Sequence, residues 1–186
     1  DKKVPLVNDP ALLLDAEGWN EIVSRKPFIK DKYVFCYFMG NNPEQREFVK
    51  RLAKEKGLKI VALLHLDQYI ASDEHYVELA PWHVSPADFV NLVKNAECVC
   101  TDSFQGTVFS IIYSRPFFTF KRFNRKASLS TNTRITSLLT RLDLMERLVT
   151  NMNVKPIFDI DWTRIQDGVS EFRNASSEYF LNAIRA

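Results

Sequence analysis

The sequence predicts an α/β protein with a doubly wound, mostly parallel sheet that is flanked by helices. Short apolar runs alternate with amphipathic segments between residues 33 and 120. The apolar runs lack polar alternation, which is typical of strands that are buried on both faces of a parallel sheet. Capping and turn residues separate the runs, and this order of strand and helix is that of linked βαβ units.

The first βαβ unit begins at the first long apolar run. Residues 33–39 are apolar without interruption and are expected to form a strand. A helix should begin at Pro43, which suits the first helical position, with Asn42 as its N-cap and Gly57 just beyond its end. Residues 58–64 are the second strand, and the crossover between the two strands should be right-handed.

The later elements follow the same alternation. Residues 65–85 are expected to be irregular, and Ser85 should cap the next helix with Asp88 in its first turn. The last helix should bury an apolar stripe that extends as far as Ile184. The expected elements are a helix to about residue 95, strands at 97–101 and 116–120, and helices at 104–114, 133–142 and 161–184.

Composition and charge describe an ordinary globular chain. Its 186 residues suit one domain, and 46% of them are hydrophobic. A net charge of +2 argues against nucleic-acid binding. Cys36, Cys98 and Cys100 are expected to be buried, reduced thiols, because their spacing fits neither a disulfide framework nor a zinc site. Reduced thiols are typical of a cytosolic protein, so a cytoplasmic location is expected. No signal peptide or membrane-spanning run is visible.

The strongest candidate site is the turn Thr101-Asp102-Ser103, between a buried strand and an apolar helix. An open α/β sheet binds its ligand beyond the carboxyl ends of its strands. The N–H groups and the dipole of a helix start favour phosphate or carboxylate. Ser103 could cap the helix, Gly106 would let a ligand approach the backbone, and Thr107 lies in the first turn. The alternative is that these residues only cap a helix.

A longer pattern extends on both sides of this turn. Its matching positions are Asp9-Pro10, Val99-x-Thr101-Asp102-Ser103-Phe104-x-Gly106-Thr107-x-Phe109-Ser110-Ile111 and Asn132-x-Arg134-Ile135-x-Ser137-Leu138-Leu139. Together they resemble the polysaccharide pyruvyl transferase family over roughly residues 9–147.

The resemblance implies a fold and an activity. Members of that family transfer the enolpyruvyl group of phosphoenolpyruvate to two sugar hydroxyls, forming a pyruvate ketal on a cell-wall or exopolysaccharide sugar. Their fold is similar to the GT-B glycosyltransferases, in which two Rossmann-like domains face a cleft. Residues 31–186 would be the C-terminal domain and residues 1–30 a linker segment that packs on it, with the N-terminal partner domain absent.

The resemblance also implies the partners. Phosphoenolpyruvate would be the donor substrate and a nucleotide- or lipid-linked sugar the acceptor, with no cofactor. A parent protein that acts on such an acceptor would associate peripherally with the inner face of the membrane.

One position departs from the family pattern. Gln105 stands where the family has a histidine that is taken as the catalytic acid. A glutamine amide does not titrate near neutral pH and cannot supply a proton, although it can hold a carboxylate or phosphate oxygen. Three explanations stay open: altered or lost activity, an engineered or sequencing change, or a replacement acid, for which His83 is the nearest candidate. The sequence therefore leaves open whether this chain is an active enzyme.

Four further residues are candidates for anion binding. Arg134 begins a helix, and its guanidinium could clamp a phosphate or carboxylate. Lys121 and Arg122 follow the carboxyl end of a strand, which is the ligand side of the sheet, although a solvated loop explains them equally well. Asn41 follows the first strand at the same edge. The histidines lack metal-ligand spacing, so no metal site is expected.

Two other functions stay open beside pyruvyl transfer. The first is a non-catalytic domain, derived from the enzyme, that binds a sugar phosphate or acts as a scaffold. The second is a GT-B glycosyltransferase that uses a nucleotide sugar. The second would need an acidic ribose ligand near the strand ends, and the sequence offers no convincing candidate.

Overall fold

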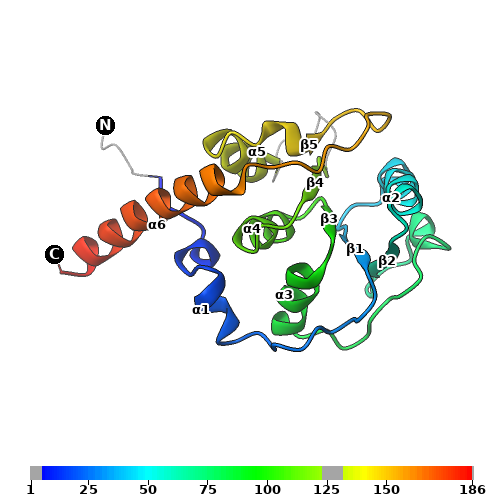
Figure 1. Cartoon of the computed structure of the whole chain (residues 1–186), viewed down its shortest axis with the longest axis horizontal. Coiled ribbons are helices and arrows are strands. Elements are labelled where there is room, and N and C mark those ends of the chain that lie inside the picture. Colours follow the sequence, from blue (N-terminus) through cyan, green and yellow to red (C-terminus); the bar gives the residue numbers. More distant parts are fainter. Residues whose placement is uncertain (1–5, 123–131, 186) are drawn as a thin grey trace.

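The computed structural model describes residues 6–122 and 132–185, and its centre is a parallel sheet (Figure 1). The order of its five strands is β2-β1-β3-β4-β5, and every neighbouring pair is parallel. The α/β, Rossmann-like class predicted from the sequence is thus confirmed. The strands are β1 (Tyr33–Tyr37), β2 (Lys59–Leu63), β3 (Cys98–Thr101), β4 (Phe117–Phe120) and β5 (Leu148–Val149).

Helices cover both faces of the sheet, as the term doubly wound requires. On one face α2 (Pro43–Lys56) packs against a core that includes Phe48 and Phe118. On the other face lie α3 (Pro86–Asn95), α4 (Phe104–Ile112) and α5 (Asn132–Arg141), around a core that includes Val108 and Leu139. The strands are buried on both sides, which explains their unbroken apolar sequences.

The predicted helix ends are confirmed by their capping geometry. The Asn42 side chain accepts the Glu44 N–H at the start of α2, and Gly57 ends that helix in the left-handed region at φ 63°. Ser85 and Asp88 form a reciprocal capping box at the start of α3.

The N-terminal residues pack on the same face of the sheet as α4. They form a 3-10 turn η1 (Pro10–Leu13) and the short helix α1 (Ala16–Asn20). Leu12 and Val23 are buried, and the Trp19 ring stands edge-on to Phe109 at 4.9 Å. The Asn8 N–H donates to Ser176 Oγ in the last helix, α6 (Trp162–Arg185).

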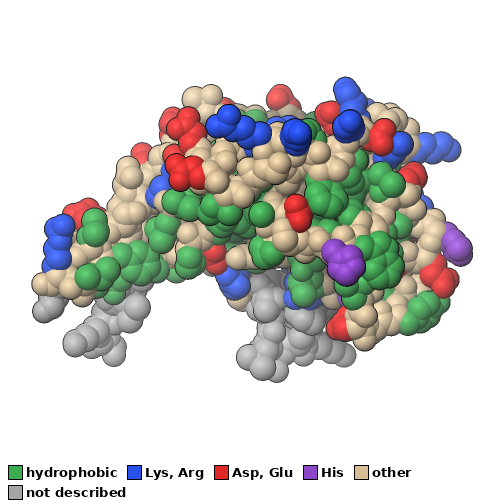
Figure 2. Space-filling view, turned by 90° about the horizontal axis from the view of Figure 1, so that it is seen from below, with side chains coloured by type: hydrophobic (Ala, Val, Ile, Leu, Met, Phe, Trp, Pro, Cys, Tyr) green, Lys and Arg blue, Asp and Glu red, His purple; other side chains and the backbone are tan. Residues whose placement is uncertain are grey.

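The structure differs from the sequence predictions at α1, at β5 and at the end of α6. The short helix α1 lies in the segment that was expected to be a linker. The strand β5, which follows the 3-10 turn η3 (Met145–Arg147), was not predicted because two residues are too few to show a periodicity. The predicted burial of Ile184 is wrong, since 83% of this residue is exposed. The reason is that α6 projects beyond the sheet, and hydrophobic side chains lie on the surface of that projection (Figures 1 and 2).

Candidate functional site

A groove lies at the carboxyl edge of the sheet, where β1 and β3 end side by side. The strand β2, which follows β1 in the chain, lies on one side of β1, and β3 lies on its other side. The strand order therefore reverses between β1 and β3. Ligands of doubly wound sheets bind outside such a point. The volume of about 880 Å³ suits a small molecule. Its lining includes Tyr37, Met39, Pro86, Phe89, Ser103 and Gln105.

Two residues of the predicted turn line this groove. Ser103 occupies the N-cap position of α4, but its side chain does not cap the helix. Gln105, the second residue of α4, is exposed. The first N–H groups of α4, which lack partners inside the helix, thus receive no cap from the Ser103 side chain. The groove therefore combines helix-start donors with the amide at the family's histidine position.

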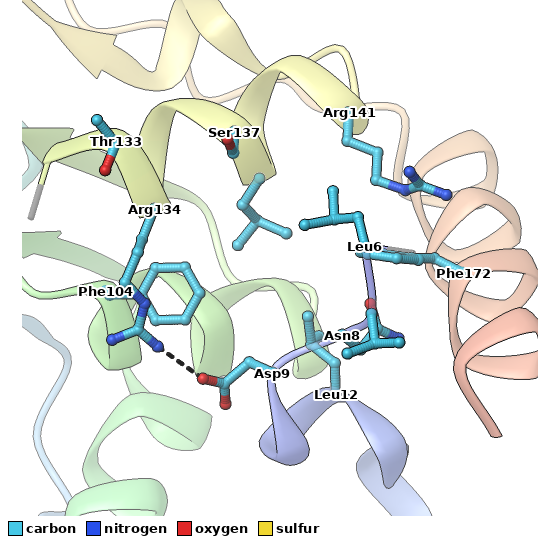
Figure 3. A pocket seen from close by; sticks show the side chains of 12 residues that line it. Leu6, Asn8, Asp9, Leu12, Phe104, Thr133, Arg134, Ser137, Arg141 and Phe172 are labelled. Atoms are coloured by element: carbon cyan, nitrogen blue, oxygen red, sulfur yellow. Dashed lines mark hydrogen bonds and ion pairs between the residues drawn. The ribbon is translucent and has the colours of Figure 1, made fainter. Parts of the chain in front are cut away.

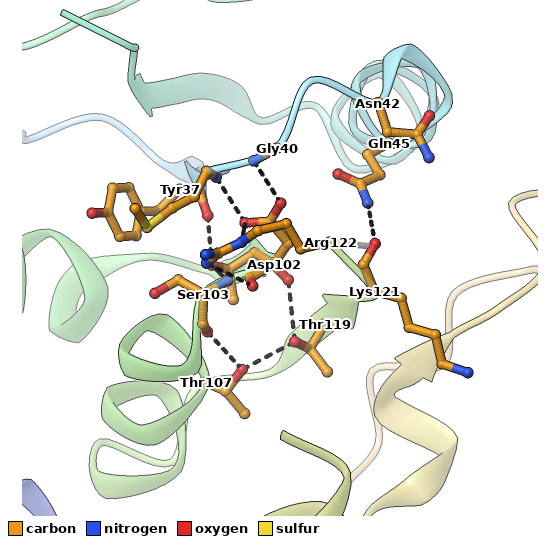
Figure 4. A network of polar contacts seen from close by, with 12 residues as sticks. Tyr37, Gly40, Asn42, Gln45, Asp102, Ser103, Thr107, Thr119, Lys121 and Arg122 are labelled. Carbon is orange, nitrogen blue, oxygen red and sulfur yellow. Dashed lines mark hydrogen bonds and ion pairs between the residues drawn. The ribbon is translucent and has the colours of Figure 1, made fainter. Parts of the chain in front are cut away.

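Asp102 holds two loops together at the floor of this edge. Its carboxylate accepts the backbone N–H groups of Met39 and Gly40 at 2.7 and 2.8 Å (Figure 4). The guanidinium of Arg122 lies 3.7 Å from it and also donates to the Asp102 carbonyl. Asp102 is only 2% exposed. This carboxylate, predicted to shape an anion site, thus fixes the loop after β1 against the turn after β3.

Gly106 and Thr107 lock α4 onto the sheet. A Cβ atom on Gly106 would stand 2.6 Å from Thr101 Oγ1, so the glycine allows the helix to approach β3 closely. Thr101 therefore fills the space through which a ligand was expected to reach the backbone. The Thr107 hydroxyl contacts the Ser103 carbonyl and the Thr119 hydroxyl, and Thr107 is fully buried. Both residues hold the start of α4 against the sheet and do not line the groove.

The other predicted anion ligands lie around the groove rather than in its lining. Lys121 is exposed, and its backbone carbonyl accepts from Gln45 Nε2. Asn41 is also exposed, and its carbonyl accepts from the Ser72 hydroxyl. The predicted basic loop continues into residues 123–131, which lie outside the described residues.

Arg134 lines a different pocket. Its guanidinium pairs with the Asp9 carboxylate at 2.7 Å and lies 4.0 Å above the Phe104 ring (Figure 3). Asp9 and Phe104 border this second pocket together with Arg134. The structure thus separates Arg134 from Gln105, which the sequence had placed in one site.

Sequence reasoning missed a buried charge network beside β2. Asp73 accepts from Arg46 at 2.6 Å and contacts His65 Nδ1 at 2.7 Å. Arg46 is 2% exposed, and Asp73 lies in the 3-10 turn η2 (Ala71–Asp73). The partners are far apart in the chain, so no spacing could have indicated the network. His83, the candidate replacement acid, is exposed and is not part of the described groove lining.

The described residues also bear on metal binding and on membrane spans. Within residues 6–122 and 132–185, no cluster of three His, Cys, Asp or Glu side chains could hold a metal ion. None of the helices in this part of the chain is long and apolar enough to span a membrane.

The fold is an α/β domain with a groove at the switch point of its parallel sheet. The sequence model of one family, polysaccharide pyruvyl transferase, matches residues 1–122. This is well over half of the chain, which therefore belongs to the polysaccharide pyruvyl transferase family. The match contains the groove and the turn at residues 101–107 and ends before α5. No curated protein matches the chain.

Solved structures resemble the chain in fold. They include the glycosyltransferase SnogD from Streptomyces nogalater, at 12% identity and a TM-score of 0.47, with 84% of this chain and 45% of that chain covered. The UDP-GlcNAc 2-epimerase from Methanocaldococcus jannaschii has 14% identity and a TM-score of 0.42, with coverage of 81% and 46%. The chain spans about half the length of the structures it matches.

Proposed function

We propose that this chain contributes the phosphoenolpyruvate side of a pyruvyl transfer site, with a sugar of a cell-surface polysaccharide as acceptor. Family membership supports pyruvyl transfer in general. The single observation that carries the assignment to a site is that Gln105, at the family's histidine position, lines the groove between β1 and β3.

Pyruvyl transfer would require the groove to bind phosphoenolpyruvate and a sugar. Two sugar hydroxyl oxygens bond to C2 of phosphoenolpyruvate, the C2–O bond to phosphate breaks, and the methylene carbon gains one proton. The second hydroxyl proton leaves with phosphate. The α4 N–H groups and the Ser103 hydroxyl would hold the carboxylate or phosphate, because a helix start favours anions. Tyr37 and Phe89 would form an apolar wall against the sugar ring.

Proton supply is the step that Gln105 cannot perform. Its amide can orient the substrate by hydrogen bonding, but the methylene carbon needs an acid. Replacing a general acid by a group that cannot titrate costs about 10²–10⁴-fold in rate. We therefore expect slow turnover or binding without turnover, the second being the non-catalytic alternative.

The substitution Gln105→His tests this proposal. Phosphate release from phosphoenolpyruvate is measured with a panel of sugar acceptors, and phosphoenolpyruvate binding is measured by calorimetry. We expect Gln105→His to bind as the wild type does and to raise the rate by about 10²–10⁴-fold. Gln68→His, in an exposed loop, is the matched control and should change neither quantity. Failure of both wild type and Gln105→His to bind phosphoenolpyruvate would contradict the proposal.

A further inference from the structure

A second pocket lies beside η1 (Figure 3), and Asp9 is the one residue that its described lining shares with that of the groove. Residues 6–12, the first residue of α4, α5 and α6 enclose a volume of about 340 Å³. That volume is near the lower end of the range for small-molecule sites. The polar residues of the lining are Asn8, Asp9, Thr133, Arg134, Ser137 and Arg141.

Asn8 presents an unsatisfied amide to this pocket. The residue is 4% exposed, and its backbone N–H is fixed by Ser176 Oγ at 2.9 Å. Its side-chain Nδ2 and Oδ1 are both buried without a hydrogen-bond partner among the described residues. Buried polar groups are nearly always paired, because an unpaired one is destabilising. The amide therefore offers a donor and an acceptor to a molecule that enters the pocket.

Arg141 supplies a positive charge at the same place. Its guanidinium lies 3.7 Å above the Phe172 ring, which holds the side chain against α6. No ion pair to Arg141 is formed within the described residues. A guanidinium held over a ring keeps its N–H groups at the edge for an anion.

The pocket as a whole carries a surplus of positive charge. Asp9 neutralises Arg134 through their contact at 2.7 Å, and Asp9 also accepts the Ala11 N–H. Two arginines against one aspartate leave a formal charge of +1 on the lining. Leu12 and Leu138 give the pocket an apolar floor, on which a carbon skeleton can pack.

We propose that this pocket binds a small hydroxylated anion, such as a sugar phosphate or a sugar acid. The anionic group would pair with Arg141, and a ligand hydroxyl would donate to the Asn8 carbonyl while the Asn8 amide donates to a ligand oxygen. The proposal rests on Asn8 and Arg141, which are not in the described lining of the groove, so it stands whether or not pyruvyl transfer occurs there.

Calorimetric titration of the protein with three probes tests the proposal. Glucose 6-phosphate and glucuronate carry the two candidate anionic groups, and glucose is the neutral control. We expect both anions to bind and glucose not to bind. The anion with the higher affinity shows whether the pocket prefers a phosphate or a carboxylate group. Arg141→Gln should weaken binding about tenfold to a hundredfold through loss of a charge-assisted hydrogen bond. Arg25→Gln, at an exposed position, makes the same charge change and should leave binding unaltered.

A second variant separates binding from folding. Asn8→Leu replaces the unpaired amide by an apolar group of similar size, so it should raise the unfolding temperature while it weakens anion binding. Equal binding by wild type and Arg141→Gln would overturn the proposal, as would no binding by either anion. Loss of sugar-phosphate binding in Gln105→Ala, with Arg141→Gln unaffected, would move the anion to the groove and also refute it. Phosphoenolpyruvate binding is measured in a separate assay. A lack of sugar-phosphate binding would therefore contradict this proposal and leave the proposed transfer reaction unaffected.

Discussion

At the scale of single residues, the polar residues of the 101–107 turn divide into two groups. Both Asp102 and Thr107 are buried. Asp102 is bonded to the backbone of the loop after β1, and Thr107 contacts the Thr119 hydroxyl in β4. Ser103 and Gln105 face the groove. The two groups differ in direction. Side chains that point back onto the sheet fix the helix start, and those that point away from it line the groove. Gly106 belongs to the first group, since it allows the contact with Thr101.

Gly106→Ala should be destabilising by about 1–3 kcal/mol, since the new methyl group would stand 2.6 Å from Thr101 Oγ1 in a packed helix–strand contact. Gly168→Ala is the matched control. Its Cβ would meet only Leu142 Cδ2 at 3.6 Å, so the better helix propensity of alanine should stabilise α6 by about 0.5–1 kcal/mol. Urea unfolding measures both free energies, and destabilisation of similar size in both variants would contradict the packing explanation.

At the scale of elements, α6 changes character along its length. Its first half packs on the core through Ile165 and Val169, which are 1% and 2% exposed. Its second half projects beyond the body, and Leu181 and Ile184 are exposed there. The amphipathic pattern continues through both halves, but only the first half has a surface to pack against. Hydrophobic spacing therefore predicted the helix and could not predict where its burial ends.

Ile165→Ala and Ile184→Ala test this difference with one chemical change. Removal of the buried side chain of Ile165 should lower the free energy of unfolding by about 2–5 kcal/mol, because a cavity remains. The same change at Ile184 should stay within about 0.5 kcal/mol, as expected for an exposed position. Thermal and urea unfolding give both values, and a large loss at Ile184 would show that the projection packs against something in solution.

At the scale of the whole molecule, three buried thiols link the stability of the fold to pH. Cys36, Cys98 and Cys100 are free, buried and part of the same core on the α2 face. Burial raises the pKa of Cys98 to about 12 and also raises the pKa of Cys36 and Cys100. The folded protein therefore keeps thiol protons that the unfolded chain loses above its ordinary pKa of about 8.5. The expectation of buried, reduced thiols is confirmed.

Stability should fall with rising pH above about 8.5, where the folded state binds more protons than the unfolded state. The stabilisation is complete below that pH and is lost toward the folded pKa of Cys98, about 12. Each thiol can contribute up to about 1.4 kcal/mol per pH unit. Urea unfolding between pH 7 and 10 measures the slope, and Cys98→Ala should reduce it. An unchanged slope in Cys98→Ala would contradict this assignment.

The sequence by itself determined the helices α2 to α6, four of the five strands and the position of Gln105 on the turn after β3. Its information was local, since apolar runs, caps and a family pattern are read along the chain. Tertiary structure decided which predicted residues meet. Strand order brought Tyr37 beside Ser103 to form the groove, and folding of residue 9 onto α5 took Arg134 to another pocket. The unpaired amide of Asn8 had no sequence signal at all, because only packing shows whether a side chain lacks a partner.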